Sequence, residues 1–162
     1  MAYACVRTDN MSGTNNGKDL VSLRYMPGET ETAIENGNVV LIGEYLEDNR
    51  EVRKATAPAN NSPLKDCALV ASEEVVKNKE YNDLSDFINE AGENIRGYRL
   101  TSRDIFSVTK EAFAEGATLE VGSLVELNGT TKFNAVKSAT DSVTSVGKII
   151  AIEGEWYVVE VE

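Results

Sequence analysis

A phrase of about ten residues occurs twice in this chain. Residues 34–43 read IENGNVVLIG and residues 119–129 read LEVGSLVELNG, with Gly37 and Gly122 at the same place in both. Glycine adopts positive φ angles without strain, so a glycine before an apolar run predicts a turn followed by a β-strand. The repetition predicts a fold built from two related β units.

The alternation inside the phrase predicts which side chains face a core. Val40 and Ile42 in the first copy correspond to Val125 and Leu127 in the second. Neighbouring residues of a strand point to opposite faces, so these apolar positions share one face. The position between them, which holds Glu126 in the second copy, is expected to face outward. Gly43 and Gly129 are expected in the turns that close the two strands.

Two further stretches recur in the same order after the phrase. They are VRKATA at 52–57 with VKSAT at 136–140, and PLKDCALVAS at 63–72 with SVGKIIAIE at 145–153. The copies therefore predict two three-stranded units, over about 33–72 and 118–153. Whether they form one barrel or two lobes stays open, and chance recurrence of a common strand phrase is the alternative.

The segment between the copies, about 81–116, predicts a helical insert. Leu84, Phe87 and Ile88 have the spacing of apolar residues on one face of a helix, which we place at 83–91. Strands are expected next, at 95–100 and 104–109, and then a single helical turn or a loop. At the end of the chain, Gly154 separates two β-branched runs, which predicts a hairpin.

The first 32 residues predict an arm and a first strand. Residues 8–19, TDNMSGTNNGKD, contain almost no apolar side chains and are expected to form a loop or flexible spacer, followed by a strand at 20–26. The domain division is thus 1–32 for the arm and first strand and 33–162 for the core. The expected fold class is mainly β with a short helix (α+β), a small barrel or sandwich.

Composition restricts the possible chemistry. The sequence has no histidine, which removes the commonest general base and metal ligand. A formal net charge of −11 disfavours nucleic-acid binding, and REVRK at 50–54 is a small basic cluster that contains a glutamate. No apolar run approaches the ~20 residues of a membrane helix, and the start lacks a secretory signal, so we expect assembly in a cytoplasm.

No catalytic, cofactor-binding or metal-binding residues are predicted. Asp83, Asp86 and Glu90 could form an acidic pair or cation site on the expected helix, but a solvated helix face explains them better. Cys5 and Cys67 lack metal-site spacing and are expected to be free thiols rather than a disulfide. We therefore do not expect an enzyme.

Residues 83–109, DLSDFINEAGENIRGYRLTSRDIFSVT, and the terminal VGKIIAIEGEWYVVEV resemble small structural proteins of tailed bacteriophages. They are most similar to the decoration, or auxiliary capsid, proteins of the head, over about residues 33–162. The resemblance implies a β-rich protein on the capsid exterior, bound to the major capsid protein. It also implies a homo-oligomer, with a trimer favoured, and no cofactor.

In similar proteins an N-terminal arm often joins a strand of a neighbouring subunit. We therefore expect Tyr3, Val6, Leu20, Leu23 and Tyr25 to contact a partner. Alternative functions are another virion component (a head fibre base, neck or tail protein), and a glycan- or metal-binding module.

Overall fold

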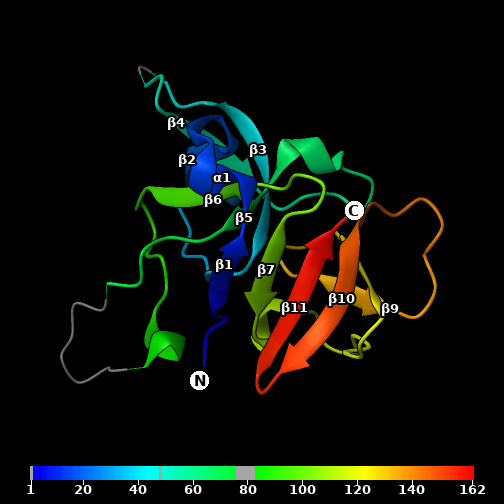
Figure 1. The fold of residues 1–162 in the computed structure, drawn as a ribbon. Coiled ribbons are helices and arrows are strands. Elements are labelled where there is room, and N and C mark those ends of the chain that lie inside the picture. The colour runs from blue at the N-terminus through cyan, green and yellow to red at the C-terminus, as the bar shows by residue number, and fades with distance from the viewer. Residues whose placement is uncertain (1, 48, 76–82) are drawn as a thin grey trace.

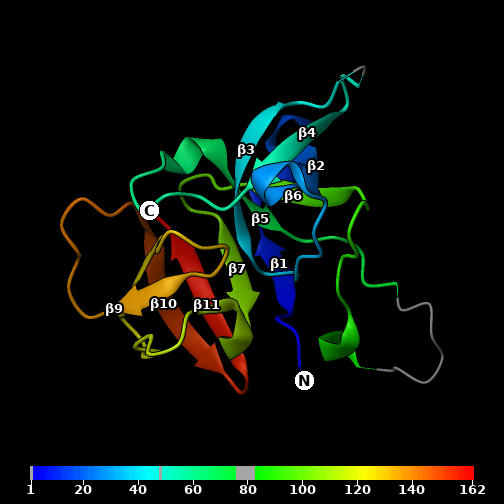
Figure 2. The same ribbon diagram turned by 180° about the vertical axis from the view of Figure 1, so that it is seen from behind.

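The computed structural model describes residues 2–47, 49–75 and 83–162. Its strands form two sheets, a closed five-stranded barrel and a six-stranded sheet, which lie one above the other in Figures 1 and 2. The barrel contains β2 (Leu20–Tyr25), β3 (Val39–Tyr45), β4 (Val52–Thr56), β5 (Cys67–Val70) and β6 (Ile95–Arg99). The second sheet contains β1 (Val6–Asn10), β7 (Ile105–Val108), β8 (Leu124–Glu126), β9 (Asn134–Val136), β10 (Ser145–Glu153) and β11 (Trp156–Val161). The mainly β fold class is confirmed.

The two sheets repeat one strand order. In the barrel, β2 is followed across the sheet by β6, β5, β3 and β4, and in the second sheet β7 is followed by β11, β10, β8 and β9. We call β2–β6 unit 1 and β7–β11 unit 2. The predicted three-stranded copies are the β3–β5 and β8–β10 parts of these units, so the repeat extends to five strands.

The units differ in how their edges meet. In unit 1, parallel pairing of β2 with β4 closes the barrel. In unit 2 the corresponding contact is reduced to a parallel bridge between Phe113 and Phe133. The N-terminal strand β1 pairs antiparallel with β7 instead, and it lies at the edge of the second sheet, below the barrel in both views (Figures 1 and 2).

Two clusters of buried side chains form the core. A small aliphatic cluster that includes Leu23, Val40 and Ile95 is contributed by unit 1. The larger cluster takes Leu69 and Tyr98 from unit 1 and its aromatic residues mainly from unit 2. Because this larger cluster is shared, the two units pack as one body.

The glycine prediction is confirmed at three of its four positions. Gly37 has φ 80°, Gly122 has φ 91° and Gly129 has φ 75°, all in the region that favours glycine. Gly43 does not close a turn, because it lies inside β3. The hairpin of β10 and β11 turns at Gly154, as expected.

The N-terminal segment is not an arm. β1 pairs with β7 and β2 lies between β4 and β6, so the division of the chain at residue 32 does not separate an arm from the core. The expected spacer at 8–19 contains the end of β1, a buried Met11, the one-turn helix α1 (Ser12–Asn15) and the 3-10 turn Gly17–Asp19. The polar composition of this segment predicted a loop. The burial of Met11 and the backbone hydrogen bonds of the two turns hold it in a regular conformation instead.

Three local predictions are also wrong. The expected helix at 83–91 is a 3-10 turn, η4 (Leu84–Asp86), after which the chain extends to bridge Ile34 through Asn89. The second strand of the second predicted copy, β9, lies at Asn134–Val136 rather than at 136–140. Glu126 is buried rather than outward-facing, since its carboxylate accepts a 2.7 Å hydrogen bond from the backbone N–H of Thr140.

Candidate interaction surface

The five predicted contact residues do not form one exposed surface. Val6 and Leu23 belong to the core, whereas Tyr3, Leu20 and Tyr25 are half-buried. Both edges of β2 are already paired, so this strand has no free edge to offer to another subunit. Of the five, Leu20 lines two of the surface depressions along the barrel and Val6 lines another, and Val6 is itself buried.

Four adjoining depressions run along one side of the barrel. Neighbouring depressions share lining residues. Ser72 lines the first and second, Asn94 lines the second and third, and Val21 lines the third and fourth. Arg96 lines three of them. We call the whole the barrel groove; it extends from β1 to the β3–β4 hairpin.

Cationic side chains converge at the hairpin end of this groove. Lys18, Arg50, Arg53 and Arg99 line it from four different segments, together with the single carboxylate of Glu51. In the part of the chain that the structure describes, none of these four cations forms an ion pair with a carboxylate. We call this the basic end of the groove.

Local contacts orient two of these cations. The Arg53 Nε donates a 2.7 Å hydrogen bond to the Gly43 carbonyl, and its guanidinium lies 5.0 Å from the ring centre of Tyr45. Arg99 donates to the Lys65 carbonyl at 3.3 Å. Tyr45 is 55% exposed, which is high for a large aromatic side chain, so an aromatic face stands beside the cations.

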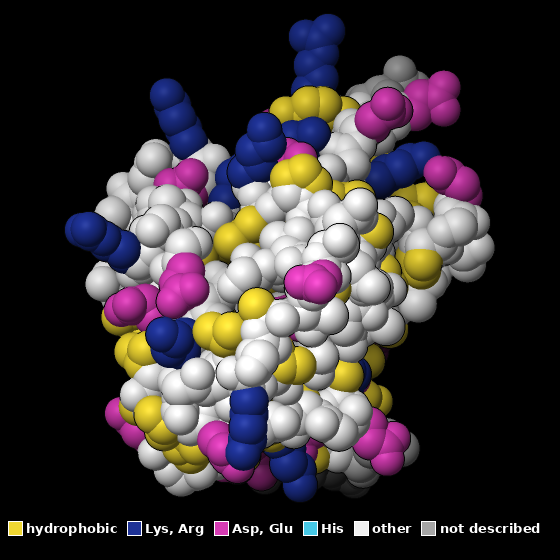
Figure 3. Space-filling model, turned by 90° about the vertical axis from the view of Figure 1, so that its right-hand side faces the viewer, with side chains coloured by type: hydrophobic (Ala, Val, Ile, Leu, Met, Phe, Trp, Pro, Cys, Tyr) yellow, Lys and Arg dark blue, Asp and Glu magenta, His cyan; other side chains and the backbone are white. Residues whose placement is uncertain are grey.

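The space-filling view shows charged side chains of both signs around the barrel (Figure 3). In Figure 3, several Lys and Arg side chains project from the upper part of the molecule, which is the barrel in Figure 1. Uncharged polar side chains and backbone cover most of the remainder of this face (Figure 3).

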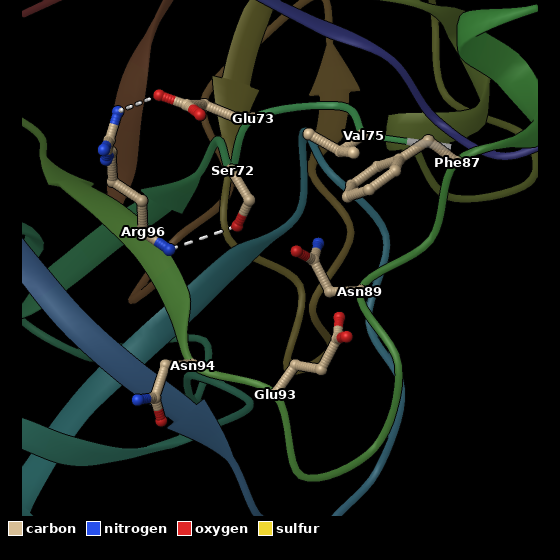
Figure 4. Close-up of a pocket in the computed structure, with 8 residues that line it drawn as sticks. All are labelled: Ser72, Glu73, Val75, Phe87, Asn89, Glu93, Asn94 and Arg96. Atoms are coloured by element: carbon tan, nitrogen blue, oxygen red, sulfur yellow. Dashed lines mark hydrogen bonds and ion pairs between the residues drawn. The ribbon is translucent and has the colours of Figure 1, made fainter. Parts of the chain in front are cut away.

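The other end of the groove, shown in Figure 4, has a different character. Arg96 pairs with Glu73 at 3.8 Å, and its backbone N–H donates to the Ser72 hydroxyl at 3.1 Å. Val75 and Phe87 stand together at the opposite side of the depression (Figure 4). This end therefore combines a partly neutralised arginine with an apolar corner, and we call it the mixed end.

A buried amide network supports the mixed end from beneath. Asn36 exchanges two hydrogen bonds with the backbone of Ser72, and its Oδ1 also accepts a 3.0 Å bond from the Asn89 amide. The Asn89 amide donates a second bond, to the Ile34 carbonyl. These amides are engaged with each other and the backbone, so their role here is to hold the 72–75 segment in place.

The acidic residues that raised the possibility of a cation site cap a turn instead. The Asp83 carboxylate accepts from the backbone N–H of Ser85, and Asp86 accepts from that of Asp83. Glu90 lies beyond this turn and outside any helix, so the i, i+4 helical pairing with Asp86 is not formed. Within the described residues no three potential ligand side chains cluster as a metal site would require.

Both cysteines are free and buried. Burial raises the pKa of the Cys67 thiol from 9.0 to about 11, and the nearby Asp66 charge acts in the same direction. Burial likewise raises the pKa of Cys5 to about 11, with smaller contributions from carboxylates led by Asp83. Both thiols are therefore neutral at pH 7 and poor nucleophiles.

Sequence inspection missed the basic end because its members are far apart in the chain. Only Arg50 and Arg53 are near neighbours, and they belong to the cluster set aside as too small and interrupted by a glutamate. Lys18 and Arg99 join them only after the barrel brings the start of β2 and the end of β6 beside the β3–β4 hairpin.

Comparisons with known proteins add no family to these observations. No family model, no curated protein and no solved structure matches the chain. Among the described residues, the helices are all too short or too polar to cross a membrane.

Proposed function

We propose that this protein is a structural component of a virion that binds the outside of a tailed-phage head and stabilises it. The proposal begins from the resemblance of residues 83–109 and of the terminal hairpin to head decoration proteins. In this chain those residues include β6 of unit 1 and β7, β10 and β11 of unit 2.

The observation that carries the proposal is the barrel groove. It is an elongated surface, and its exposed residues include arginines and Tyr45, the residue types that contribute most at protein–protein contacts. Such a surface suits attachment to another protein. In this proposal the major capsid protein is the partner, and the preformed barrel surface replaces the arm that the sequence predicted.

Sedimentation with expanded, empty phage heads tests this function. We expect the purified protein to pellet with heads and to protect them against disruption by heat. Removal of residues 1–19 is an unsuitable test, because it would remove β1 and the buried Met11 and so disturb the core. The suitable variant is the double substitution Lys18→Glu/Arg50→Glu, since both side chains are exposed.

Lys110→Glu/Lys137→Glu provides the matched control, because it also reverses two exposed charges, both in unit 2 and outside the lining of the groove. The proposal predicts loss of pelleting for the double variant and normal pelleting for the control. A wild-type protein that stays in the supernatant with expanded heads would contradict it. Electron microscopy then separates decoration, with density over the capsomers, from a neck component, with density in one ring.

A further inference from the structure

We infer that the barrel groove binds an extended, acidic polypeptide segment whose carboxylates lie at the basic end. This inference names the chemistry of the partner at the surface used in the proposed function and rests on that surface being an attachment site. It does not depend on which protein supplies the segment.

Among the described residues, the four cations of the basic end form no ion pair with a carboxylate. The molecule carries 27 acidic and 16 basic residues, so cations should find carboxylates easily. Even so, Lys18, Arg50, Arg53 and Arg99 gather around one carboxylate, and none of them is ion-paired among the described residues. Arginine guanidinium groups bind carboxylates with two parallel hydrogen bonds, which gives direction as well as attraction.

The charge distribution along the groove argues for a polypeptide over a phosphate polymer. Four cations face one glutamate at the basic end, but Glu73 and Glu74 line the far depressions beside Arg96 and Arg7. A nucleic acid has negative charge along its whole length, so its far part would lie against these glutamates and be repelled there. A polypeptide can place its carboxylates at one end only.

The apolar surface of the groove indicates the remainder of the segment. Leu20 and Val21 lie between the two ends, and Val75 and Phe87 form the apolar corner of the mixed end (Figure 4). A small anion would leave these surfaces uncovered. The best fit is therefore a segment with several acidic residues followed, a few positions along the chain, by a large apolar residue.

Fluorescence anisotropy with a synthetic peptide tests the inference without phage heads. The probe is labelled Gly-Glu-Gly-Glu-Gly-Glu-Gly-Ser-Gly-Phe, and the control peptide has glutamine in place of each glutamate. We expect saturable binding of the acidic probe at low salt, weakened at least tenfold by Lys18→Glu/Arg50→Glu and much less by the control Lys110→Glu/Lys137→Glu, which changes the net charge equally. Circular dichroism of each variant confirms that it is folded.

Competition separates the ligand classes. An unlabelled acidic peptide should displace the probe, whereas a 20-nucleotide oligothymidylate at the same charge concentration should not. Equal binding of the glutamine peptide, unchanged binding by the double variant, or displacement by the oligonucleotide would each overturn the inference.

The peptide and head experiments together separate the two proposals. If the probe does not bind while heads still bind wild type but not the double variant, the attachment proposal stands and only the ligand assignment is wrong. If the probe binds as expected and heads do not, the assignment stands and the capsid proposal falls.

Discussion

Unit 1 and unit 2 share a strand order, but a face that is buried in unit 1 meets solvent in unit 2. Register identifies the equivalent positions: in unit 1, Leu69 pairs with Val39 on one side and Tyr98 on the other. In unit 2, Lys148 occupies the same place, between Leu124 and Glu160. The first row is apolar and buried, whereas the second carries two charged side chains, of which Glu160 is exposed.

The difference follows from what each face contacts. The outer face of unit 1 packs into the core shared with unit 2, so its side chains must be apolar. The equivalent face of unit 2 meets solvent, and Lys148 there pairs with Glu162 at 3.7 Å. One strand topology thus accommodates two residue patterns, because burial of each face, and not the topology, determines which side chains are tolerated.

Reciprocal substitution at this position has the largest expected effect. Leu69→Lys would place an unpaired charge at a site with 0% exposure, and we expect a loss of more than about 4 kcal/mol, or failure to fold. Lys148→Leu should change stability by less than about 0.5 kcal/mol, since it removes only a surface ion pair. Urea titration followed by circular dichroism measures both, and similar losses for the two would show that the faces are not different.

The next effect tests whether the units depend on one core. Phe133 is fully buried, with ring centres 5.7 Å from Phe106 and 6.2 Å from Phe113. Phe133→Ala should cost about 3–5 kcal/mol through the lost contacts and the cavity. Because the aromatic cluster continues to Leu69 and Tyr98 of unit 1, we expect a single unfolding transition at lower urea. A variant that melts in two steps, with unit 1 unchanged, would show separate cores.

The sequence predicted the β units because their information is local. Alternating apolar residues and the turn glycines Gly37 and Gly122 indicate strands wherever they occur. The prediction of a helix at 83–91 was wrong. Leu84, Phe87 and Ile88 fit a helical spacing over less than two turns, and a helix of that length does not form without tertiary support. The bridge from Asn89 to Ile34, more than fifty residues away, determines the actual conformation there.

Long-range contacts also explain the two errors that bear on the candidate site. The first residues were expected to be an arm because their composition is polar, yet β1 is held by pairing with β7, about a hundred residues later. The basic end of the groove needed the parallel pairing of β2 with β4, which no local pattern indicates. Pairing partners distant in sequence are the information that a single chain does not display.

A smaller effect should distinguish the turns of the two repeated phrases. Asn36 is buried and bonded to Ser72 and Asn89, whereas Val121, at the same place in the second phrase, is 63% exposed. Asn36→Val should cost about 2–3 kcal/mol, because it leaves buried polar groups without partners. Val121→Asn should be neutral within about 0.5 kcal/mol. Thermal unfolding of the pair measures the difference; a neutral Asn36→Val would show that the amide network adds no stability.

An effect confined to high pH concerns Cys67, whose thiol belongs to the shared core at a position where unit 2 holds no cysteine. Its pKa is about 11 in the folded protein and 9.0 when exposed, so only the unfolded chain releases the proton between these values. The folded state should be unaffected below pH 9 and lose at most about 1.4 kcal/mol per pH unit from pH 9 to 11. Cys5 and Tyr25, whose pKa values burial also raises, act in the same direction.

The measurement therefore compares wild type with Cys67→Ala by the slope of the unfolding free energy against pH. A shallower slope for the variant is expected, and equal slopes would show that this thiol ionises as readily in the folded protein as in the unfolded chain.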